Sequence, residues 1–253
     1  MVRIPIGTLL ISLCMLAGSG CLQERSILYS VAGEPWPESF GNHRAVLDIQ
    51  SDAEAVRIDI PWRRHDPDPQ KRMLLLVSAD TGDTIPNIQR IRVDGEKCEL
   101  LAGPVKAGSY YFYYLPFEVQ EGYGFYNKDY LPAEPAPDPL WLEKAAQEDF
   151  PAASLLRFEA RTELDNFYPM EVIPFESEMQ DFLEVHPDTF LYFTEDRSDP
   201  VRMWDKIPHK WILDPKLNHF SGSALRNEYF VFQVALYTSK AALDDLQLSF
   251  TSL

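Results

Sequence analysis

Short alternating segments, separated by proline and glycine, are the feature that most constrains the fold of this chain. Residues Val56–Ile60 read VRIDI, which places every apolar side chain on one face of a half-buried strand. Residues 43–49 and 155–164 alternate in the same way, and 73–77 form a continuous apolar run typical of a strand buried on both faces. Aromatic residues dominate 110–117 (YYFYYLPF), which favours strand most strongly.

One helix is predicted over Glu176–Val185, because Met179, Phe182 and Leu183 repeat at helical spacing and Pro187 follows the last turn. With about ten strands, the pattern predicts a mainly β chain, an antiparallel β-sandwich with one short helix. Further strands are predicted at 190–193, 229–237 and 246–250.

The predicted domain organisation has four parts. We expect a signal peptide over residues 1–20, a linker over 21–42 and an N-terminal β-sandwich over 43–199. Residues 200–253 are expected to form a crossover and the beginning of a second β-sandwich. The last strands of the chain cannot bury an apolar face by themselves, so they either join the first domain or continue in a longer polypeptide.

The leader predicts export. Arg3 precedes about fourteen mostly apolar residues, too short a run for a stable membrane span and typical of a signal-peptide core. Small residues then lead to Cys21, which resembles the bacterial lipoprotein signal, although Gly18 stands where a larger aliphatic residue is usual. We expect a cell-envelope lipoprotein, in the periplasm or on the outer-membrane surface, attached only through lipid on Cys21. The alternative is an ordinary signal peptide in which Cys21 is incidental.

Charge limits the partners. The chain carries 23 Lys and Arg against 39 Asp and Glu, a formal charge of −16. This balance argues against nucleic acid and disfavours adhesion to anionic lipid. Sulfated or uronic glycans would also be repelled unless basic residues cluster, and the one such cluster in the sequence is Arg63, Arg64, Lys71 and Arg72. A neutral or N-acetylated glycan is therefore the expected carbohydrate partner.

No catalytic motif is present. The sequence lacks G-x-S-x-G, a Walker loop and G-x-G-x-x-G, and its five histidines are isolated. One cysteine outside the leader excludes a cysteine-rich zinc site. We therefore predict no catalytic residue, no metal and no cofactor. The acid pairs Glu163/Asp165 and Glu195/Asp196 could flank a sugar only if held about 5–10 Å apart, and a solvated acidic face is favoured instead.

Three tryptophans are candidate sugar-contacting residues: Trp62, Trp204 and Trp211. The flat apolar face of a sugar ring pairs with an indole, whose N–H also needs a partner. Trp204 and Trp211 lie beside prolines and charged residues, so we expect them to be the more exposed. The alternative for each is a place in the core.

Several segments together resemble the N-terminal region of bacterial proteins similar to glycoside hydrolase family 123. They are GNHRAVLDI, IPWRRHDPDPQKR, SYYFYYLPF, EARTELDNFYPMEVI, FTEDRSDPVRMWDKIPHKWI and NEYFVFQVALY, at residues 41–49, 60–72, 109–117, 159–173, 193–212 and 227–237. The resemblance implies an N-terminal sandwich, further sandwich structure and a downstream (β/α)₈ barrel. In this family the barrel's Asp–Glu pair hydrolyses terminal N-acetylgalactosamine-type sugars with the substrate's acetamido group as nucleophile.

Because this chain does not reach the barrel, the resemblance assigns it no catalytic residue. We expect a non-catalytic region of an exported glycoside hydrolase-like protein, inactive by itself, whose partner is a downstream barrel in the same polypeptide. One alternative is a complete surface lipoprotein that binds glycan without cleaving it. Another is a purely structural envelope lipoprotein.

Overall fold

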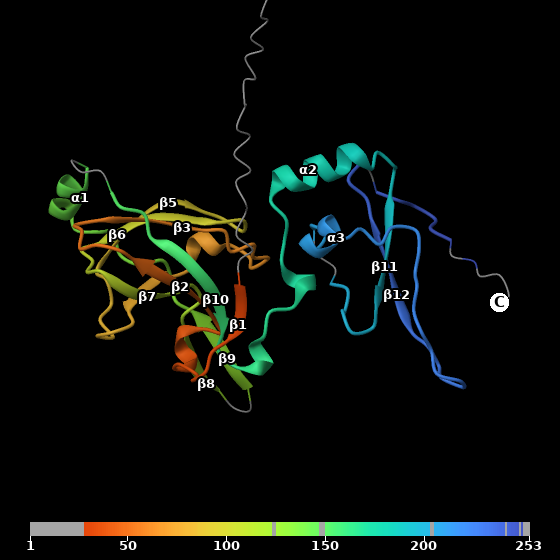
Figure 1. Ribbon diagram of the computed structural model, residues 1–253, viewed down its shortest axis with the longest axis horizontal. Coiled ribbons are helices and arrows are strands. Elements are labelled where there is room, and N and C mark those ends of the chain that lie inside the picture. The colour runs from red at the N-terminus through yellow and green to blue at the C-terminus, as the bar shows by residue number, and fades with distance from the viewer. Residues whose placement is uncertain are drawn as a thin grey trace, which may run out of the picture.

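The computed structural model describes residues 28–122, 125–146, 150–202, 205–240, 242–247 and 249. The chain forms two units, a larger β-sandwich that ends near residue 160 and a smaller unit of helices and a two-stranded sheet (Figure 1). The predicted signal peptide and Cys21 lie outside the described residues.

The sandwich consists of two facing sheets. The larger has the strand order β1 (Leu28–Val31), β10 (Ser154–Ala160), β2 (His43–Ile49), β7 (Gly108–Tyr113) and β4 (Leu75–Ser78). The smaller has the order β3 (Val56–Ile60), β6 (Cys98–Gly103) and β5 (Asn87–Val93). The pair β1–β10 is parallel and the other pairs within these sheets are antiparallel. The predicted mainly β, antiparallel sandwich is confirmed.

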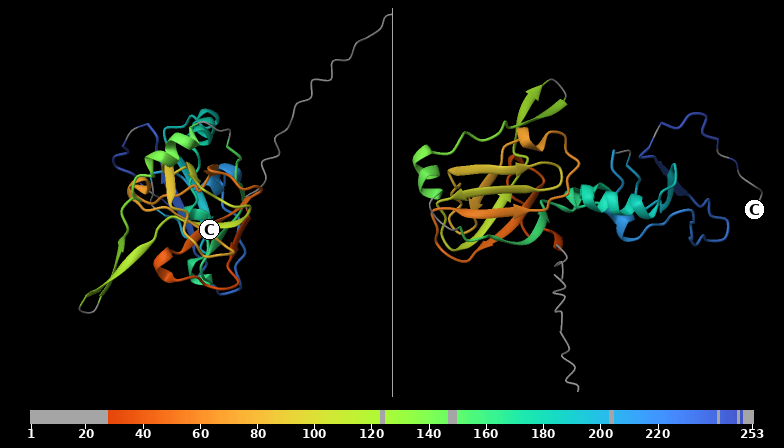
Figure 2. Two further views of the ribbon diagram at one scale, coloured as in Figure 1. Left: turned by 90° about the vertical axis from the view of Figure 1, so that its left-hand side faces the viewer. Right: turned by 90° about the horizontal axis from the view of Figure 1, so that it is seen from above.

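A hairpin of β8 (Phe117–Gly122) and β9 (Phe125–Tyr130) projects from one side of the sandwich (Figure 2). Its base lies beside the end of β7, because Phe117 follows that strand by only a few residues. Phe117 is buried, whereas the exposed Tyr130 side chain meets it edge to face, with 6.3 Å between ring centroids. The hairpin thereby places Tyr130 and its neighbour Lys128 at the edge of the sandwich.

The predicted alternation produces the main core. Val56, Ile58 and Ile60 of β3 are fully buried, and they face the equally buried Ala45, Leu47 and Ile49 of β2 across the sandwich. Leu76 and Val77 are both buried, as expected for the apolar run, although β4 begins at Leu75 rather than at residue 73.

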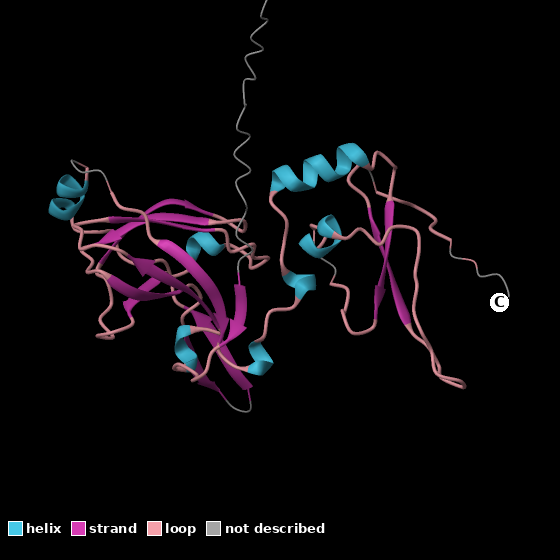
Figure 3. Cartoon of the chain, viewed as in Figure 1, coloured by secondary structure: helices cyan, strands magenta, loops and turns pink. Residues whose placement is uncertain are grey.

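The structure contains more helix than predicted. Helix α2 spans Glu176–Val185, as predicted, and two further helices are α1 (Pro139–Ala145) and α3 (His209–Leu213). Short 3₁₀ turns lie at Glu38–Phe40, Pro69–Lys71, Glu163–Asp165 and Pro169–Glu171. Figure 3 shows that helix is a larger part of the smaller unit than of the sandwich.

The smaller unit is held by a second core. Phe182 of α2, Trp211 of α3 and Phe193 of β11 (Leu191–Asp196) are buried together, and β12 (Phe232–Tyr237) pairs antiparallel with β11. The predicted domain boundary at residue 199 therefore falls between two strands of one sheet. Periodicity identified both strands, but it does not predict which strands pair with each other. Strand pairing depends on the tertiary fold.

The strand predicted at 246–250 is not formed by the described residues of that segment, Leu246, Gln247 and Ser249. Leu246 is 54% exposed. For these three residues the predicted strand is absent, because an alternating segment becomes a strand only when a neighbouring edge accepts its hydrogen bonds. Leu248 and Phe250 lie outside the described residues.

The two units are joined by a connecting segment, residues 161–175, and by an ion pair. Arg63 donates to both carboxylate oxygens of Glu178, at 2.6 and 2.8 Å, and its guanidinium lies 3.8 Å from the Phe175 ring centroid. The Ile173 amide donates to the Arg63 carbonyl oxygen at 3.1 Å. Sandwich and smaller unit are thus held together by contacts besides the covalent chain.

We expect Arg63→Met to weaken the junction by about 2 kcal/mol, because it removes a largely buried bidentate pair but keeps the aliphatic stem. The measurement is limited proteolysis of residues 161–175 together with urea unfolding. As a control, Arg197→Met removes an exposed pair with Glu228 and should change stability by less than about 1 kcal/mol. Equal proteolysis rates for the two variants would contradict this role of Arg63.

Candidate functional site

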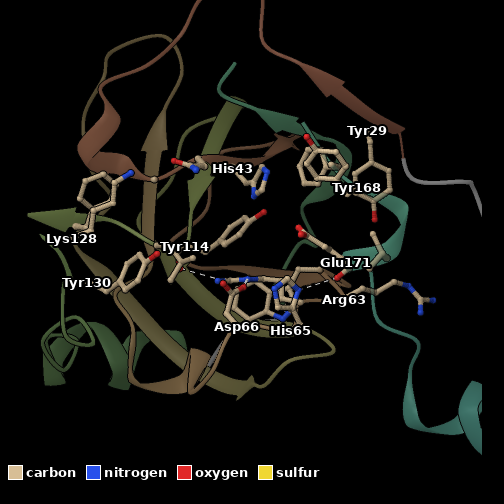
Figure 4. A pocket seen from close by; sticks show the side chains of 18 residues that line it. Tyr29, His43, Arg63, His65, Asp66, Tyr114, Lys128, Tyr130, Tyr168 and Glu171 are labelled. Atoms are coloured by element: carbon tan, nitrogen blue, oxygen red, sulfur yellow. Dashed lines mark hydrogen bonds and ion pairs between the residues drawn. The ribbon is translucent and has the colours of Figure 1, made fainter. Parts of the chain in front are cut away.

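A cavity of about 240 Å³ opens at the edge of the sandwich, beside the connecting segment. It collects residues from six stretches of chain: Tyr29 of β1, His43 of β2, Trp62–Asp66 after β3, Tyr114 and Leu115 after β7, Lys128 and Tyr130 of β9, and Phe167, Tyr168 and Glu171 of the connecting segment (Figure 4). Aromatic and charged side chains are therefore mixed in its wall.

The segment after β3 forms the floor of this cavity. Pro61 ends the strand, and Arg63 adopts the left-handed conformation with φ of 49°. The Arg64 amide then donates to the Gly95 carbonyl oxygen at 2.6 Å. A Cβ at residue 95 would lie 2.8 Å from the Arg64 carbonyl oxygen, so this close approach of two backbones requires glycine.

Arg64 is the central polar group of the site. Its Nε donates to Asp66 Oδ2 at 2.5 Å, and its Nη1 donates to the Tyr114 carbonyl oxygen at 3.4 Å. The guanidinium carbon lies 4.2 Å from the Tyr114 ring centroid and 4.7 Å from that of Trp62. The side chain is only 6% exposed, yet Nη2 makes no hydrogen bond within the described part of the chain. A buried donor without an acceptor costs about 1–3 kcal/mol.

The charge states of the neighbouring groups follow from their surroundings. Burial by itself would raise the pKa of Asp66, but the Arg64 charge and hydrogen bond outweigh it and hold that pKa below its usual value. Burial lowers the pKa of His43, whose Nε2 donates to the Asp165 carbonyl oxygen at 2.6 Å. The neutral His43 ring therefore keeps Nδ1 as an acceptor.

The charged groups of the cavity are paired. Arg64 pairs with Asp66, Lys128 pairs with Glu38 at 2.9 Å, and Glu171 pairs with Arg202 at 3.2 Å. Arg63 points away from the cavity (Figure 4), toward its partner Glu178. The site is thus a polar cavity with little net charge in a strongly acidic chain.

The structure buries two of the three candidate tryptophans. Trp62 lines the cavity, is 5% exposed and donates from Nε1 to the Asp94 carbonyl oxygen at 2.6 Å. Trp211 lies in the smaller unit, so the two are not brought together. Trp204 lies outside the described residues.

The expectation that Trp211 is exposed is wrong, because it is 3% exposed. Its ring stacks on Phe193 with 4.4 Å between centroids, and its Nε1 donates to Glu195 Oε2 at 3.0 Å. An indole can be buried beside charged residues when one of them accepts its N–H.

The solvated acidic face favoured for the acid pairs is wrong at Glu195. Glu195 is fully buried and accepts from Lys210 at 3.0 Å and from Lys216 at 3.4 Å. Glu163 and Asp165 lie in a 3₁₀ turn rather than on a strand face. Within the described residues there is no cluster of three or more metal-ligating side chains, and no helix long and apolar enough to cross a membrane.

Sequence reasoning missed most of the site. Tyr29, His43, Asp66 and Tyr168 are distant in sequence and share no motif. Two local signals were present. Trp62 was a candidate sugar-contacting residue, and the charged, proline-punctuated stretch 63–69 placed two arginines directly after a predicted strand. What brings the other residues to Arg64 is the pairing of β10 with β1 and β2, and the path of the connecting segment.

Together these features define a β-sandwich domain with a polar, aromatic cavity at its edge. The family model described as glycoside hydrolase 123, N-terminal domain, matches residues 34–161, and the chain belongs to this family. The match runs from before β2 to just past the end of β10 and includes Arg64, Asp66 and Tyr114. No curated protein and no solved structure matches the chain.

Proposed function

We propose that this chain is the non-catalytic N-terminal region of an exported glycoside hydrolase, and that a downstream barrel in the same polypeptide hydrolyses terminal N-acetylgalactosamine-type sugars. The observation that carries the proposal is the family match to a glycoside hydrolase N-terminal domain, which coincides with the sandwich. The sandwich would hold the barrel clear of the membrane to which lipid on Cys21 anchors the protein.

The acids of the cavity support a non-catalytic role. A glycosidase needs one carboxylic acid that stays protonated near neutral pH, which requires a raised pKa. Asp66 has a lowered pKa, because Arg64 outweighs the effect of burial. Glu171, the other acid of the cavity wall, is ion-paired with Arg202. The environment of Asp66 therefore does not favour a protonated carboxyl group.

The outer face of the β11–β12 sheet supports a continuing polypeptide. Phe232, Val234 and Leu236 alternate on β12 and are 43–48% exposed, and Tyr192 lies opposite Leu236 on β11. The inner face of the same sheet already packs against the second core. Phe220 stacks on Phe232, with 4.7 Å between ring centroids, but the face as a whole stays about half exposed. A two-stranded sheet with such a face is only marginally stable, so we propose that the next part of the polypeptide covers it.

The test is to read the open reading frame past codon 253 and to assay the full product and the 253-residue chain with p-nitrophenyl N-acetyl-β-galactosaminide. We expect hydrolysis by the full product and none by the chain. Asp66→Asn in the full product should leave kcat unchanged, because the chemistry takes place in the barrel. Hydrolysis by the chain alone, abolished by Asp66→Asn, would overturn the proposal. A stop codon after Leu253 would instead favour a glycan-binding or structural lipoprotein.

A further inference from the structure

The sheet of the smaller unit has an open hydrogen-bonding edge, the outer side of β12 (Phe232–Tyr237). We propose that the polypeptide following residue 253 adds a β-strand to this edge, so that β12 becomes an inner strand of a larger sheet. This inference rests on the proposed function in one respect, because it needs the longer polypeptide. It goes further by naming the backbone groups through which the two parts join.

Strand β11 already has a neighbour on each of its edges. On one side it pairs with β12. On the other side the Thr194 amide donates to the Lys216 carbonyl oxygen at 3.1 Å, and the Tyr192 carbonyl oxygen accepts from the Asn218 amide at 3.3 Å. Because backbone groups alternate in direction along a strand, the even-numbered residues of β11 point away from β12 and the odd-numbered residues point toward it.

The strand register identifies the open groups of β12. Phe193, an odd-numbered residue of β11, lies opposite Ala235, so Ala235 and the residues two positions away from it bond to β11. The residues whose N–H and C=O groups point outward are Phe232, Val234 and Leu236. Within the described part of the chain, no backbone hydrogen bond is made to these outward groups.

Strand β12 lacks the features that protect a natural edge. Edge strands usually carry charged residues, proline or a bulge, which prevent pairing with another strand. β5, an edge of the smaller sheet of the sandwich, carries Arg90 and Arg92 and has a register shift between them. β12 reads FQVALY, without charge or proline, and it pairs with β11 without a register shift. Its sequence is therefore typical of an inner strand.

The exposed side chains of β12 belong to the same residues as the outward backbone groups. Phe232, Val234 and Leu236 are 43–48% exposed, and Tyr192 of β11, opposite Leu236, is 38% exposed. A strand placed beside β12 would bring its own side chains against these residues as cross-strand neighbours. One added strand would thus satisfy the edge and reduce the exposure of the apolar face.

The position of the sheet excludes the sandwich as its cover. Figures 1 and 2 show β11 and β12 at the end of the smaller unit farthest from the sandwich, with α2 and α3 between them. The inner face of the sheet packs on these helices. The family model describes an N-terminal domain, which supports further polypeptide on the C-terminal side as the source of the added strand.

A second copy of the chain fits this edge less well. Two β12 edges could pair with each other, but the two apolar faces would then lie side by side and both would stay exposed. The pairing would also bring together two chains that each carry a formal charge of −16. A continuing polypeptide can pair with the edge and also cover the face, and its covalent connection gives it a high effective concentration.

The experiment compares backbone hydrogen exchange, resolved to single amides, in the full product and in the 253-residue chain. In the 253-residue chain, we expect the Phe232, Val234 and Leu236 amides to exchange at least about tenfold faster than those of Gln233 and Ala235. In the full product, the three outward amides should exchange at least about 100-fold more slowly than in the 253-residue chain. Equal exchange in the two proteins, or a stop codon directly after Leu253, would overturn the proposal.

A proline variant separates strand pairing from simple burial. Val234→Pro removes an outward N–H, and proline is tolerated where the N–H of an edge strand faces solvent. In the 253-residue chain, exchange at Gln233 and Ala235 should therefore change by less than about threefold. In the full product, protection at Phe232 and Leu236 should fall at least about tenfold.

Val234→Ala is the matched control, because it shortens the same side chain but keeps the N–H. It should keep the protection of the full product to within about threefold. Equal loss of protection in the proline and alanine variants would show packing on the face without strand pairing, and would overturn the proposal. If Val234→Pro fails to fold, the comparison of the two unchanged proteins decides.

Two further readouts keep the outcomes distinct. We expect the 253-residue chain to sediment as a monomer at low micromolar concentration, and a dimer that Val234→Pro dissociates would assign the edge to a second copy and overturn the proposal. Hydrolysis by a full product whose β12 amides stay unprotected would support the proposed function and reject this inference. Protected β12 amides in a full product without hydrolase activity would do the reverse.

Discussion

Shortening Phe112 to alanine is expected to lower the free energy of unfolding of the sandwich by about 3–5 kcal/mol. Phe112 is fully buried in the centre of β7, the strand between β2 and β4. Its strand neighbours in register are Ala45 and Leu76, both fully buried, so little nearby can move to fill the space. The cost combines the lost burial of the ring with the cavity left behind.

The measurement is urea unfolding followed by far-ultraviolet circular dichroism. Leu156→Ala is the control, because Leu156 lies on β10 of the same sheet but is 44% exposed, and we expect a change below about 1 kcal/mol. If Phe112→Ala cost no more than the control, the core between the two sheets would be loosely packed.

Replacing Glu195 with alanine is expected to destabilise the smaller unit by about 3 kcal/mol. Glu195 is 0% exposed and accepts from Trp211 Nε1 and from Lys210 Nζ, both at 3.0 Å. Its removal leaves the indole N–H buried without an acceptor and takes from Lys210 one of its carboxylate partners, the other being Asp199 at 2.6 Å. Glu195→Gln keeps a side-chain oxygen that can accept from Trp211, so it should cost less than the alanine variant.

The effect of Glu195 should depend on pH. Burial would raise the pKa of Glu195, but hydrogen bonds from Trp211 and Lys210 outweigh it and hold that pKa below its usual value of 4.5. When a carboxyl group has a lower pKa in the folded state than in the unfolded state, its contribution to stability is complete at pH values above the unfolded-state pKa. This contribution is lost as the pH falls through the folded-state pKa. The stability difference between Glu195→Gln and the unchanged chain should therefore be constant near pH 7 and shrink below about pH 4.5.

Tryptophan fluorescence during urea unfolding at several pH values measures this effect. Glu184→Ala is the control, because Glu184 is an exposed acid on α2 of the same unit. A pH-independent difference between Glu195→Gln and the unchanged chain would show that the carboxylate charge does not stabilise the unit.

The pattern of apolar residues predicted helices and strands well where buried side chains recur at regular helical or strand spacing. The apolar stripe over residues 176–185 predicted a helix with the bounds that α2 has in the structure, and the segment VRIDI predicted every residue of β3. Pattern failed where the outcome depended on a distant partner. Leu246 alternates like a strand residue but has no strand to pair with among the described residues, and Trp211, beside charged residues, is buried because Glu195 accepts its N–H.

The candidate site was the least predictable part. Arg64 was visible as one of two consecutive arginines, but nothing local distinguishes it from Arg63, which pairs with Glu178 at the junction. The left-handed turn at Arg63 and the close contact with Gly95 set the backbone from which the two neighbouring side chains diverge. These are tertiary constraints, since Gly95 is distant in sequence.

The mainly β class, the main strands and the resemblance to the glycoside hydrolase 123 N-terminal region could all be inferred from the amino-acid sequence, and the family match over residues 34–161 confirms the resemblance. These follow from residue order, because period and propensity act between near neighbours. Tertiary structure alone decided that β11 pairs with β12, that Trp62 and Trp211 are buried in separate cores, and that Arg64 lies with an unsatisfied donor beside the tyrosines. Each of these depends on contacts between distant segments, which no local pattern encodes.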